Sequence, residues 1–480
     1  MNVIKSFIRK YRGMQVQARA SIWYTICNVL QKGISFIVIP IYIRVLTTEE
    51  YGVYTVFQSW RDILIIFATL NLYAGVFTKA MVDFEDDRDV YTSSMQGLST
   101  LVTGAMFIVY ICASPTWNRL LDLDLVTMLL LFLYFVFYPA LTFWTVRKRV
   151  ENDYRKMVVV TLLVSVLTPA VSLMLFYGTS LRERAVVWGY LVVQSLFGGY
   201  FYVRQFLAGR TFYHRDYWVK ALRFNIPLIP HYLSLIILGQ ADRIMIKEYC
   251  GKSDAAIYGL AHQLATVMSI VTNAVNSSFV PWVYDRFKRK RFGDIGGIST
   301  KLCVFVAAMT LGLTIVAPEI IRIVGTDEYQ AAVWAIPPVA LSVYYTFCYG
   351  LFCDIEFYYG ETHYVMLASV IGAALNIVLN AIFIPRFGFL AAGYTTMVCY
   401  FIFMLMHYLF MRRVCRKMDI PLNVFNVPAI AVLTAAITGI CLLCIQVYPL
   451  MWLRYAVVLV MAAVVIVKRR TIIELLRRNK

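Results

Sequence analysis

Charged residues lie inside two long apolar stretches near the amino end of the chain. Lys32 lies in the middle of the first stretch (21–43), and Arg61 and Asp62 lie within the second (52–78). Each stretch is long enough to cross a bilayer as a helix. A charged side chain at the bilayer centre costs roughly 2.5–3.5 kcal/mol on insertion scales, so such residues usually face a bundle interior or a watery cavity. The pattern predicts that these two helices line a cationic cavity.

Polar residues continue along the same helix faces. In the first stretch they follow one another at steps of four, three, four and three, which places them on one side of a helix. In the second stretch they share a face with the arginine. The two stripes consist of Ser21, Thr25, Asn28, Lys32 and Ser35, and of Tyr54, Gln58 and Arg61.

A second pair of predicted helices, at 225–247 and 254–283, has the same character. The first helix of this pair carries Asp242 and Arg243 near its end, and the second carries His262. We expect four polar stripes to converge on one chamber. The predicted substrate-binding residues are Lys32, Arg61, Asn28, Gln58, Arg243, Asn273 and Asn276, and the predicted ion-coupling residues are Asp62, Asp242 and His262.

Structural roles for the same charged residues stay open at this point. Arg61 and Asp62 are neighbours that can neutralise each other, and Asp242 can pair with Arg243, because structural ion pairs are common in such settings. A lone histidine such as His262 often donates only to a nearby carbonyl, and the asparagines can serve as interhelical hydrogen-bonding groups.

The composition is that of a membrane protein. Of 480 residues, 60% are hydrophobic and only 15% are charged, against about 25% charged in soluble domains. Apolar runs of about twenty residues recur along the chain. We predict an all-α polytopic protein with about fourteen transmembrane helices, near 21–43, 52–78, 93–113, 123–145, 157–177, 185–206, 225–247, 254–283, 298–322, 331–353, 363–384, 388–411, 427–447 and 449–467.

The net charge of +18 comes from Lys and Arg in the loops between the predicted helices and in the terminal segments. It therefore does not indicate a nucleic-acid binding site. With the amino terminus in the cytoplasm, Lys and Arg gather in the even-numbered loops and in both terminal segments, while the odd-numbered loops carry few. This asymmetry is the positive-inside rule, and it predicts that both termini lie in the cytoplasm. The acidic loop 83–89 departs from the pattern, but acidic residues contribute little to orientation.

Enzyme and metal motifs are absent from the sequence pattern. There is no GxSxG motif, no glycine-rich phosphate loop, no spacing typical of metal ligands and no loop of catalytic-domain size. The ten cysteines are scattered through or beside apolar runs, so no disulfide framework is expected. We therefore predict a protein that is not an enzyme, without catalytic residues, a metal site or a cofactor other than a coupling ion, H⁺ or Na⁺.

Short matches recur at offsets of 200–204 residues. Tyr54 corresponds to Tyr258, Gly97-Leu-Ser-Thr100 to Gly297-Ile-Ser-Thr300, and Gly189-Tyr190 to Gly393-Tyr394. An even number of helices per repeat keeps both halves in the same orientation, as in transporters with parallel repeats. The predicted divisions are a six-helix lobe (1–206), a cytoplasmic linker (207–224), a second six-helix lobe (225–411), a cytoplasmic loop (412–426) and two extra helices with a basic tail (427–480).

Several motifs resemble those of the polysaccharide transporter family, the oligosaccharide repeat-unit (O-antigen) flippases. This family lies in the superfamily of multidrug, oligosaccharidyl-lipid and polysaccharide flippases. The resemblance covers the first twelve helices. It is carried by Arg44-Val-Leu-Thr-Thr-Glu-Glu-Tyr-Gly-Val-Tyr54, Ala241-Asp-Arg-Ile-Met-Ile246, Ala256-Ile-Tyr-Gly-Leu-Ala261 and Ala374-Leu-Asn-Ile-Val-Leu-Asn-Ala-Ile-Phe-Ile-Pro385.

The resemblance implies two six-helix lobes in a V around a central cavity. It also implies that an undecaprenyl-diphosphate-linked oligosaccharide is moved from the inner to the outer leaflet by ion-coupled alternating access, for O-antigen, capsule or exopolysaccharide synthesis. Lys32 and Arg61 suit a diphosphate, because cations bind phosphate strongly where the dielectric is low. The expected partners are this substrate, membrane lipid and polysaccharide-assembly proteins, and no nucleic acid.

Three other functions remain open on the sequence. A peptidoglycan-precursor flippase shares the cationic cavity and the helix number. A multidrug extruder of the same superfamily favours an acidic cavity, whereas the central charges here lean positive. A membrane-embedded polymerase or acyltransferase would be expected to carry a sizeable outer loop, and the predicted outer loops are short.

Overall fold

The computed structural model describes residues 16–73, 75–452, 454–456 and 459, and within these residues all regular structure is helical. Twelve of the described helices are long and apolar enough to cross a membrane. Helix α3 (Thr48–Thr69) is not among the twelve and carries four charged residues. The predicted helix 449–467 lies mostly outside the described residues. The expectation of an all-α polytopic membrane protein with about fourteen helices is confirmed.

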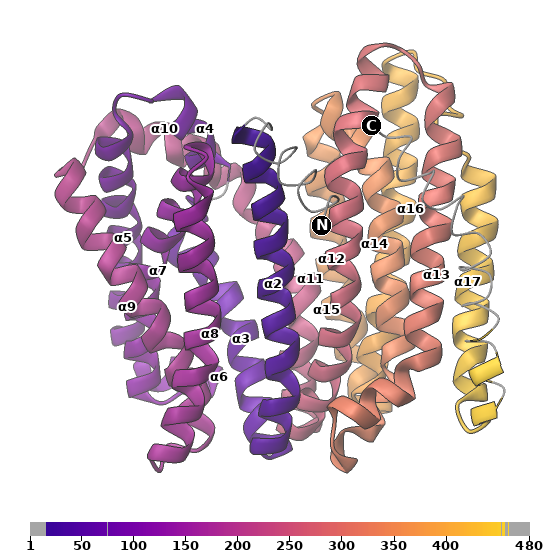
Figure 1. Ribbon diagram of the computed structural model, residues 1–480, viewed down its shortest axis with the longest axis horizontal. Helices are drawn as coiled ribbons and strands as arrows, with labels where there is room; N and C mark the ends of the chain where they lie inside the picture. Colours follow the sequence, from indigo (N-terminus) through magenta and orange to yellow (C-terminus); the bar gives the residue numbers. More distant parts are fainter. Residues whose placement is uncertain (1–15, 74, 453, 457–458, 460–480) are drawn as a thin grey trace, which may run out of the picture. The chain divides into compact units, whose positions relative to one another are not determined.

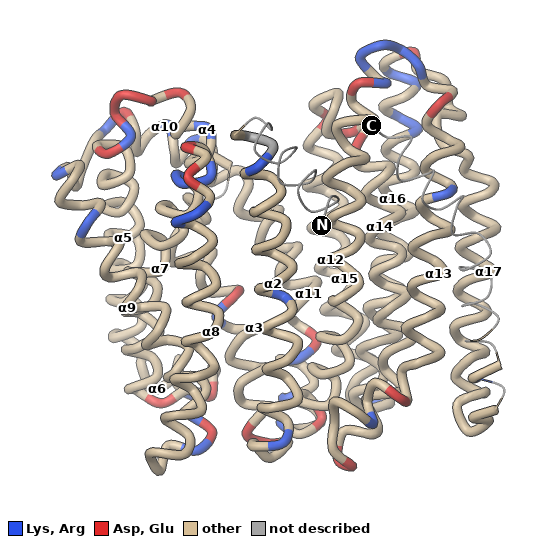
Figure 2. The backbone as a smooth tube through the Cα atoms, viewed as in Figure 1, with Lys and Arg blue, Asp and Glu red and all other residues tan. Residues whose placement is uncertain are grey.

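The chain forms two compact units, Met1–Ala256 and Ile257–Lys480. Figure 1 shows the helices of each unit, and Figure 2 shows that charged residues in each unit lie mainly at the helix ends. The first unit contains α2 (Val16–Val45), α3, α4 (Val76–Asp83), α5 (Arg88–Cys112), α6 (Ser114–Leu121), α7 (Leu125–Val150), α8 (Tyr154–Gly178), α9 (Glu183–Gly209), α10 (Arg215–Asn225) and α11 (Ile229–Cys250).

The second unit is built from the remaining described helices. Helix α12 (Lys252–Lys288) begins in the first unit and runs into the second. The others are α13 (Gly293–Val324), the 3-10 helix η2 (Asp327–Trp334), α14 (Ile336–Tyr358), α15 (Thr362–Phe387), α16 (Leu390–Lys417) and α17 (Val427–Val447). Buried apolar residues of α12, α13, α14, α16 and α17 form one continuous core there.

The predicted helix 52–78 is two helices rather than one. Helix α3 ends at Thr69, and Leu70 and Asn71 adopt a positive φ of 48° and 52° before α4 begins at Val76. The break leaves backbone groups that need partners, and side chains supply them. The Thr69 hydroxyl accepts from the Asn71 N–H, and the buried Asn225 amide donates to the Leu70 carbonyl at 3.1 Å.

The segment between α9 and α11 is largely helical. The predicted linker 207–224 contains most of α10, and a short 3-10 turn, Ile226–Leu228, joins α10 to α11. Pro227 and Pro230 each lie in the first turn of a helical element, where a missing N–H costs nothing. Helix α11, which the repeat assigns to the second lobe, belongs to the first compact unit. The lobe boundaries at 206 and 225 stay predictions.

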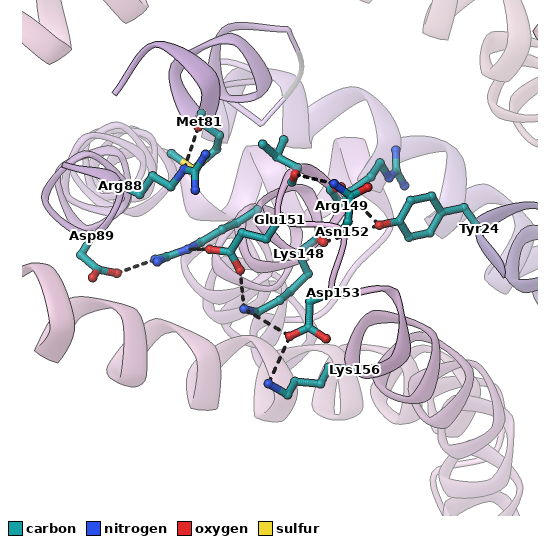
Figure 3. A network of polar contacts seen from close by, with 12 residues as sticks. Tyr24, Met81, Arg88, Asp89, Lys148, Arg149, Glu151, Asn152, Asp153 and Lys156 are labelled. Carbon is teal, nitrogen blue, oxygen red and sulfur yellow. Dashed lines mark hydrogen bonds and ion pairs between the residues drawn. The ribbon is translucent and has the colours of Figure 1, made fainter. Parts of the chain in front are cut away.

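The acidic loop after α4 is tied to the end of α7 by a network of ion pairs (Figure 3). Arg147 pairs with Asp89 and, through Nε, with Glu151 at 2.7 Å. Lys148 bridges Glu151 and Asp153. Partial burial raises the pKa of Glu151, but the hydrogen bonds from Lys148 and Arg147 outweigh that effect and hold the pKa below its usual value. The loop therefore holds helix ends together.

Candidate functional site

The polar stripe of α2 lies on the surface of the protein. All five residues of the stripe, including Asn28 and Lys32, are exposed. Another face of α2 packs on α8 through the buried Cys27, and Gln31 donates to the Ser165 hydroxyl at 3.3 Å. Within the part of the chain that the structure describes, no hydrogen bond or ion pair occupies the Lys32 ammonium group. Lys32 is thus a cation in the middle of an apolar helix that is available to an anionic ligand.

Helix α3 is oriented by the way it begins. The Thr47 hydroxyl accepts from the Glu50 N–H at 3.2 Å, while the Glu50 carboxylate accepts from the Thr47 N–H at 2.9 Å. This reciprocal pair is a capping box, which satisfies two backbone donors at the helix start. Arg182 adds an ion pair to Glu50 at 3.0 Å. The sequence Thr-Thr-Glu-Glu therefore determines where α3 begins and which face carries its polar residues.

Arg61 is engaged by its neighbour rather than being a free cation. Two of its N–H groups donate to one carboxylate oxygen of Asp62, at 2.9 and 2.5 Å. Its side chain is 13% exposed and that of Asp62 is 29% exposed. The guanidinium also lies 4.6 Å from the centroid of the Tyr190 ring, a cation–π contact. Both predicted roles of this pair, as mutual partners and as polar lining, are compatible with these contacts.

The network continues from α3 to α11. Gln240 donates to the second carboxylate oxygen of Asp62 at 3.1 Å, and its own carbonyl oxygen accepts from Ser59 and from Arg243 at 3.2 and 2.9 Å. Arg243 and Asp242 are both buried. The structure therefore brings three predicted site residues, Arg61, Asp62 and Arg243, into one network. Gln240, which the sequence analysis did not select, connects them.

A cluster of tyrosines lies beside this network. Tyr190 on α9 and Tyr134 on α7 lie with their hydroxyls 3.4 Å apart, and the Tyr134 ring packs on Tyr138 at 4.8 Å. Gln58, another predicted site residue, donates to the Tyr54 hydroxyl at 2.8 Å on the same helix. Such rings give a surface that is apolar on its faces and polar at its edges, which suits contacts with both sugars and lipid.

One end of α3 lies against the start of α12. A Cβ atom on Gly52 would lie 2.0 Å from the Lys252 carbonyl oxygen, so only glycine permits this approach. Next to it the hydroxyls of Thr48 and Ser253 are 3.2 Å apart. A cavity of about 280 Å³ lies nearby in the same unit, lined by Val53, Asn118, Asp122, Leu123, Asp124, Thr127, Glu183, Arg184, Val187 and Lys252.

Two lysines meet one carboxylate at this end. Asp122, in the turn after α6, pairs with Lys247 at 3.2 Å and with Lys252 at 3.1 Å. Partial burial raises the pKa of Asp122, but hydrogen bonds from Lys252 and Lys247 outweigh that effect and lower it. The ion pairs attach the α6–α7 turn to the end of α11 and the start of α12.

The remaining predicted site residues belong to the second unit. The Thr266 hydroxyl contacts His262 Nδ1 at 3.4 Å and donates to the His262 carbonyl at 2.7 Å. Asn273 is exposed and Asn276 is half-buried. Whether these three residues share a chamber with Lys32 and Arg61 stays a prediction.

Sequence analysis missed a buried polar cluster in the second unit. Glu356 on α14 and His407 on α16 are fully buried, and His407 Nδ1 lies 3.0 Å from both carboxylate oxygens. Cys353 lies one helical turn before Glu356 and is also buried. The only sequence signal was the Cys-x-x-Glu spacing, which places both side chains on one helix face. The histidine is 51 residues away, so no local motif contains all three groups.

Solved structures with this fold are membrane flippases and transporters. The chain aligns with "Lipid II flippase MurJ, inward closed conformation" with a TM-score of 0.72 and 12% identity, covering 94% of this chain and 100% of that one. It aligns with an inward-facing multidrug-resistance MATE transporter of the MOP superfamily with a TM-score of 0.64 and 13% identity, covering 83% and 99%. The protein is therefore a multi-pass membrane protein with the fold of this class.

Sequence comparison identifies the family within that class. The family model described as polysaccharide biosynthesis protein matches residues 18–285, more than half of the chain, and the MatE model matches residues 227–382. A Lsg locus protein of Haemophilus influenzae is 22% identical over 375 residues, which cover 74% of this chain and 88% of the relative. The chain belongs to the polysaccharide biosynthesis protein family, as its motifs had suggested.

Proposed function

We propose that the protein moves an undecaprenyl-diphosphate-linked oligosaccharide repeat unit from the inner to the outer leaflet of the bacterial cytoplasmic membrane. The product serves the assembly of a surface polysaccharide. The observation that carries the proposal is Lys32, an exposed cation in the middle of an apolar helix, in a family of polysaccharide biosynthesis proteins. A diphosphate that passes through the membrane needs such a counter-charge, because its charge is costly in hydrocarbon.

Lys32 and Arg61 take different parts in this proposal. Lys32 meets the diphosphate directly, since its ammonium group has no partner among the described residues. Arg61 is already bound to Asp62 and packed on Tyr190, so it becomes available only when that network rearranges. Asn28 and Gln58 add amide groups to the same two helices, and Arg243 joins Arg61 through Gln240.

Transport proceeds by alternating access in this proposal. The contact of α3 with α11 and the start of α12 opens during each cycle, because the repeat assigns these helices to different lobes and rocking of repeats exposes a site to either side. A proton or a sodium ion drives the cycle, with Asp62, Asp242 and His262 as the coupling candidates. Asp62 is the best placed of the three, because its two oxygens connect Arg61 to Gln240.

The experiment compares Lys32→Gln with Lys32→Arg in a strain that lacks the native gene. The Gln variant is expected to lose surface polysaccharide and to accumulate undecaprenyl-linked repeat units at the inner leaflet, while the Arg variant keeps most of the polymer. Ser35→Ala, on the same exposed stripe, is the matched control. Normal polymer in the Lys32→Gln strain at wild-type protein level would contradict the assignment.

A peptidoglycan-precursor flippase is the second candidate, favoured by the MurJ alignment over nearly the whole chain. The two functions separate in a deletion strain. Growth with normal cell-wall synthesis and loss of a surface polymer supports the repeat-unit substrate, whereas arrest of cell-wall synthesis supports the precursor. A multidrug extruder would instead alter drug susceptibility and leave both polymers intact.

A further inference from the structure

The cluster of Cys353, Glu356 and His407 lies between two membrane helices of the second unit. One ligand atom from each residue lies within 4.8 Å of the others, and the three side chains are 4%, 0% and 0% exposed. Residues 353 and 356 are one turn apart on α14, and His407 comes from α16, which packs along α14. A thiol, a carboxylate and an imidazole thus lie close together in the buried interface between α14 and α16.

The cluster is not satisfied by its own hydrogen bonds. His407 Nδ1 offers one hydrogen to a carboxylate with two oxygens, both 3.0 Å away. His407 Nε2 is buried and has no hydrogen-bond partner among the described residues. If only the imidazole is neutral, the carboxylate charge stays uncompensated, and if the imidazole is protonated, Nε2 buries an N–H without an acceptor. If both groups are neutral and the carboxyl O–H donates to Nδ1, the N–H at Nε2 again has no acceptor among the described residues. Each of these arrangements leaves a buried charge or a buried polar group without a partner, which is costly in a membrane interior.

A divalent metal ion compensates the buried negative charge. A thiolate and a carboxylate supply two negative charges and the neutral imidazole supplies a third ligand, so a divalent ion leaves the site neutral. Zinc binds sulfur at about 2.3 Å and nitrogen or oxygen at about 2.0–2.2 Å, which places tetrahedral ligand atoms roughly 3.3–3.8 Å apart. A cluster whose ligand atoms already lie within 4.8 Å reaches that geometry by small side-chain rotations.

The kind of donor selects the kind of metal. Calcium and magnesium prefer oxygen donors alone, and copper(I) prefers thiolate and thioether sulfur. One sulfur, one nitrogen and one oxygen suit a borderline divalent ion such as Zn²⁺. Two rings hold the imidazole in place, Tyr349 stacked on it at 5.2 Å and Phe403 edge-on at 4.6 Å. Such outer contacts fix the orientation of a metal ligand.

We propose that Cys353, Glu356 and His407 form a buried binding site for a divalent transition metal ion of the zinc class, which joins α14 to α16. The site is independent of the proposed transport substrate, so it can be tested without any transport assay.

The test uses the full-length protein in detergent, loaded with Zn²⁺ and freed of excess metal before its zinc content is measured. Wild type is expected to hold one zinc per chain. Cys353→Ala and His407→Gln are expected to lose it, with affinity falling by more than the roughly 10–100-fold that outer contacts contribute. The control is Cys415→Ala, which removes a buried cysteine of α16 outside the cluster, and this variant is expected to keep the zinc.

Cobalt supplies a second measurement on the wild-type protein alone. A Co²⁺-loaded chain is expected to show a thiolate-to-cobalt charge-transfer band, which Zn²⁺ then removes by displacement. This measurement decides the matter if the variants fail to elute as folded monodisperse protein. Wild type without bound zinc, zinc retained in Cys353→Ala, or a cobalt spectrum without a thiolate band would each overturn the proposal.

Discussion

Arg61 stabilises the first unit through the shape of its side chain as well as its charge. Arg61→Lys keeps the charge but loses the paired N–H donors to Asp62 and the flat contact with Tyr190. We expect the variant to unfold about 1–2 kcal/mol more easily, from the sum of a charge-assisted hydrogen bond and a cation–π contact. Thermal unfolding of the purified protein measures this.

Tyr190→Phe is the control for that prediction. It keeps the aromatic face toward Arg61 and removes only the hydroxyl that approaches Tyr134. Its stability is therefore expected to stay closer to wild type than that of Arg61→Lys. If Arg61→Lys unfolds like wild type, the stability of the first unit does not depend on these contacts.

Residue-level prediction from the sequence was partly successful. The polar stripes and the Arg61–Asp62 pairing follow from spacing, because residues one, three or four apart in a helix have known relative directions. The hydrogen bond between Gln240 and Asp62 joins residues 178 positions apart in the sequence. Helical periodicity predicts neighbours within one helix and says nothing about which helices pack together. The contact between Glu356 and His407, 51 residues apart, escapes prediction on the same ground.

At the scale of helices, the contact between α3 and the start of α12 can be locked. The Thr48 and Ser253 hydroxyls are 3.2 Å apart, so Thr48→Cys with Ser253→Cys is expected to form a disulfide on oxidation. Replacing Cys250 by Ser in the same chain prevents a competing bond. Because transport as proposed requires this contact to open, the oxidised variant is expected to lose surface polymer and a reductant to restore it.

Each single cysteine variant is the control for the disulfide and is expected to keep its activity under both conditions. Full transport by a chain that is demonstrably cross-linked would mean that this contact stays closed throughout the cycle.

The ion-pair network at the end of α7 predicts a dependence of stability on pH. The pKa of Glu151 is lowered in the folded state, so its contribution is complete above the unfolded value of about 4.3 and is lost as the pH falls through the folded pKa. Glu151→Gln is expected to cost about 1 kcal/mol at neutral pH.

Unfolding measured at neutral and acidic pH tests this prediction. The difference between wild type and Glu151→Gln is expected to shrink in acid, because the wild-type carboxylate is then protonated as well. A difference that stays constant across the range would assign the effect to packing rather than to charge.

Helix positions were predictable and helix interruptions were not. Apolar runs of membrane length locate most helices to within a few residues, because the bilayer imposes their length. The stretch 52–78 is long enough to be one membrane helix, yet it breaks at Leu70, where side chains from α3 and Asn225 replace the helical hydrogen bonds. Those partners exist only in the folded protein, so hydropathy alone predicts a continuous helix.

For the whole molecule, the distribution of Lys and Arg predicts the sidedness of every loop. Ser180→Cys, in an exposed turn after α8, is expected to react with a membrane-impermeant maleimide in intact cells. Asp86→Cys, in the exposed acidic loop, is expected to react only after lysis. Cys112 is exposed and is replaced by Ser in both chains. The reverse labelling pattern would invert the predicted topology.

The two glycines of one matched pair both lie at close helix contacts, although the helices that they contact are not counterparts in the predicted repeat. A Cβ on Gly189 would meet Ser172 on α8, and a Cβ on Gly393 would lie 3.1 Å from Pro338 on α14, so both glycines lie at close helix contacts. Gly97 and Gly297 differ, because a Cβ on Gly97 would lie 2.0 Å from the Phe212 carbonyl and one on Gly297 meets nothing. A sequence match therefore predicts a shared position in the repeat but not a shared environment.

The break after α3 has a consequence for the order in which the chain is made. The Leu70 carbonyl obtains its partner from Asn225, which is synthesised 155 residues later. At about 5–20 residues per second, this interval lasts roughly 8–30 s. Until then α3 holds Arg61 and Asp62 in the membrane without Gln240, so the insertion machinery must shelter a helix with four charged residues while its partners are still being translated.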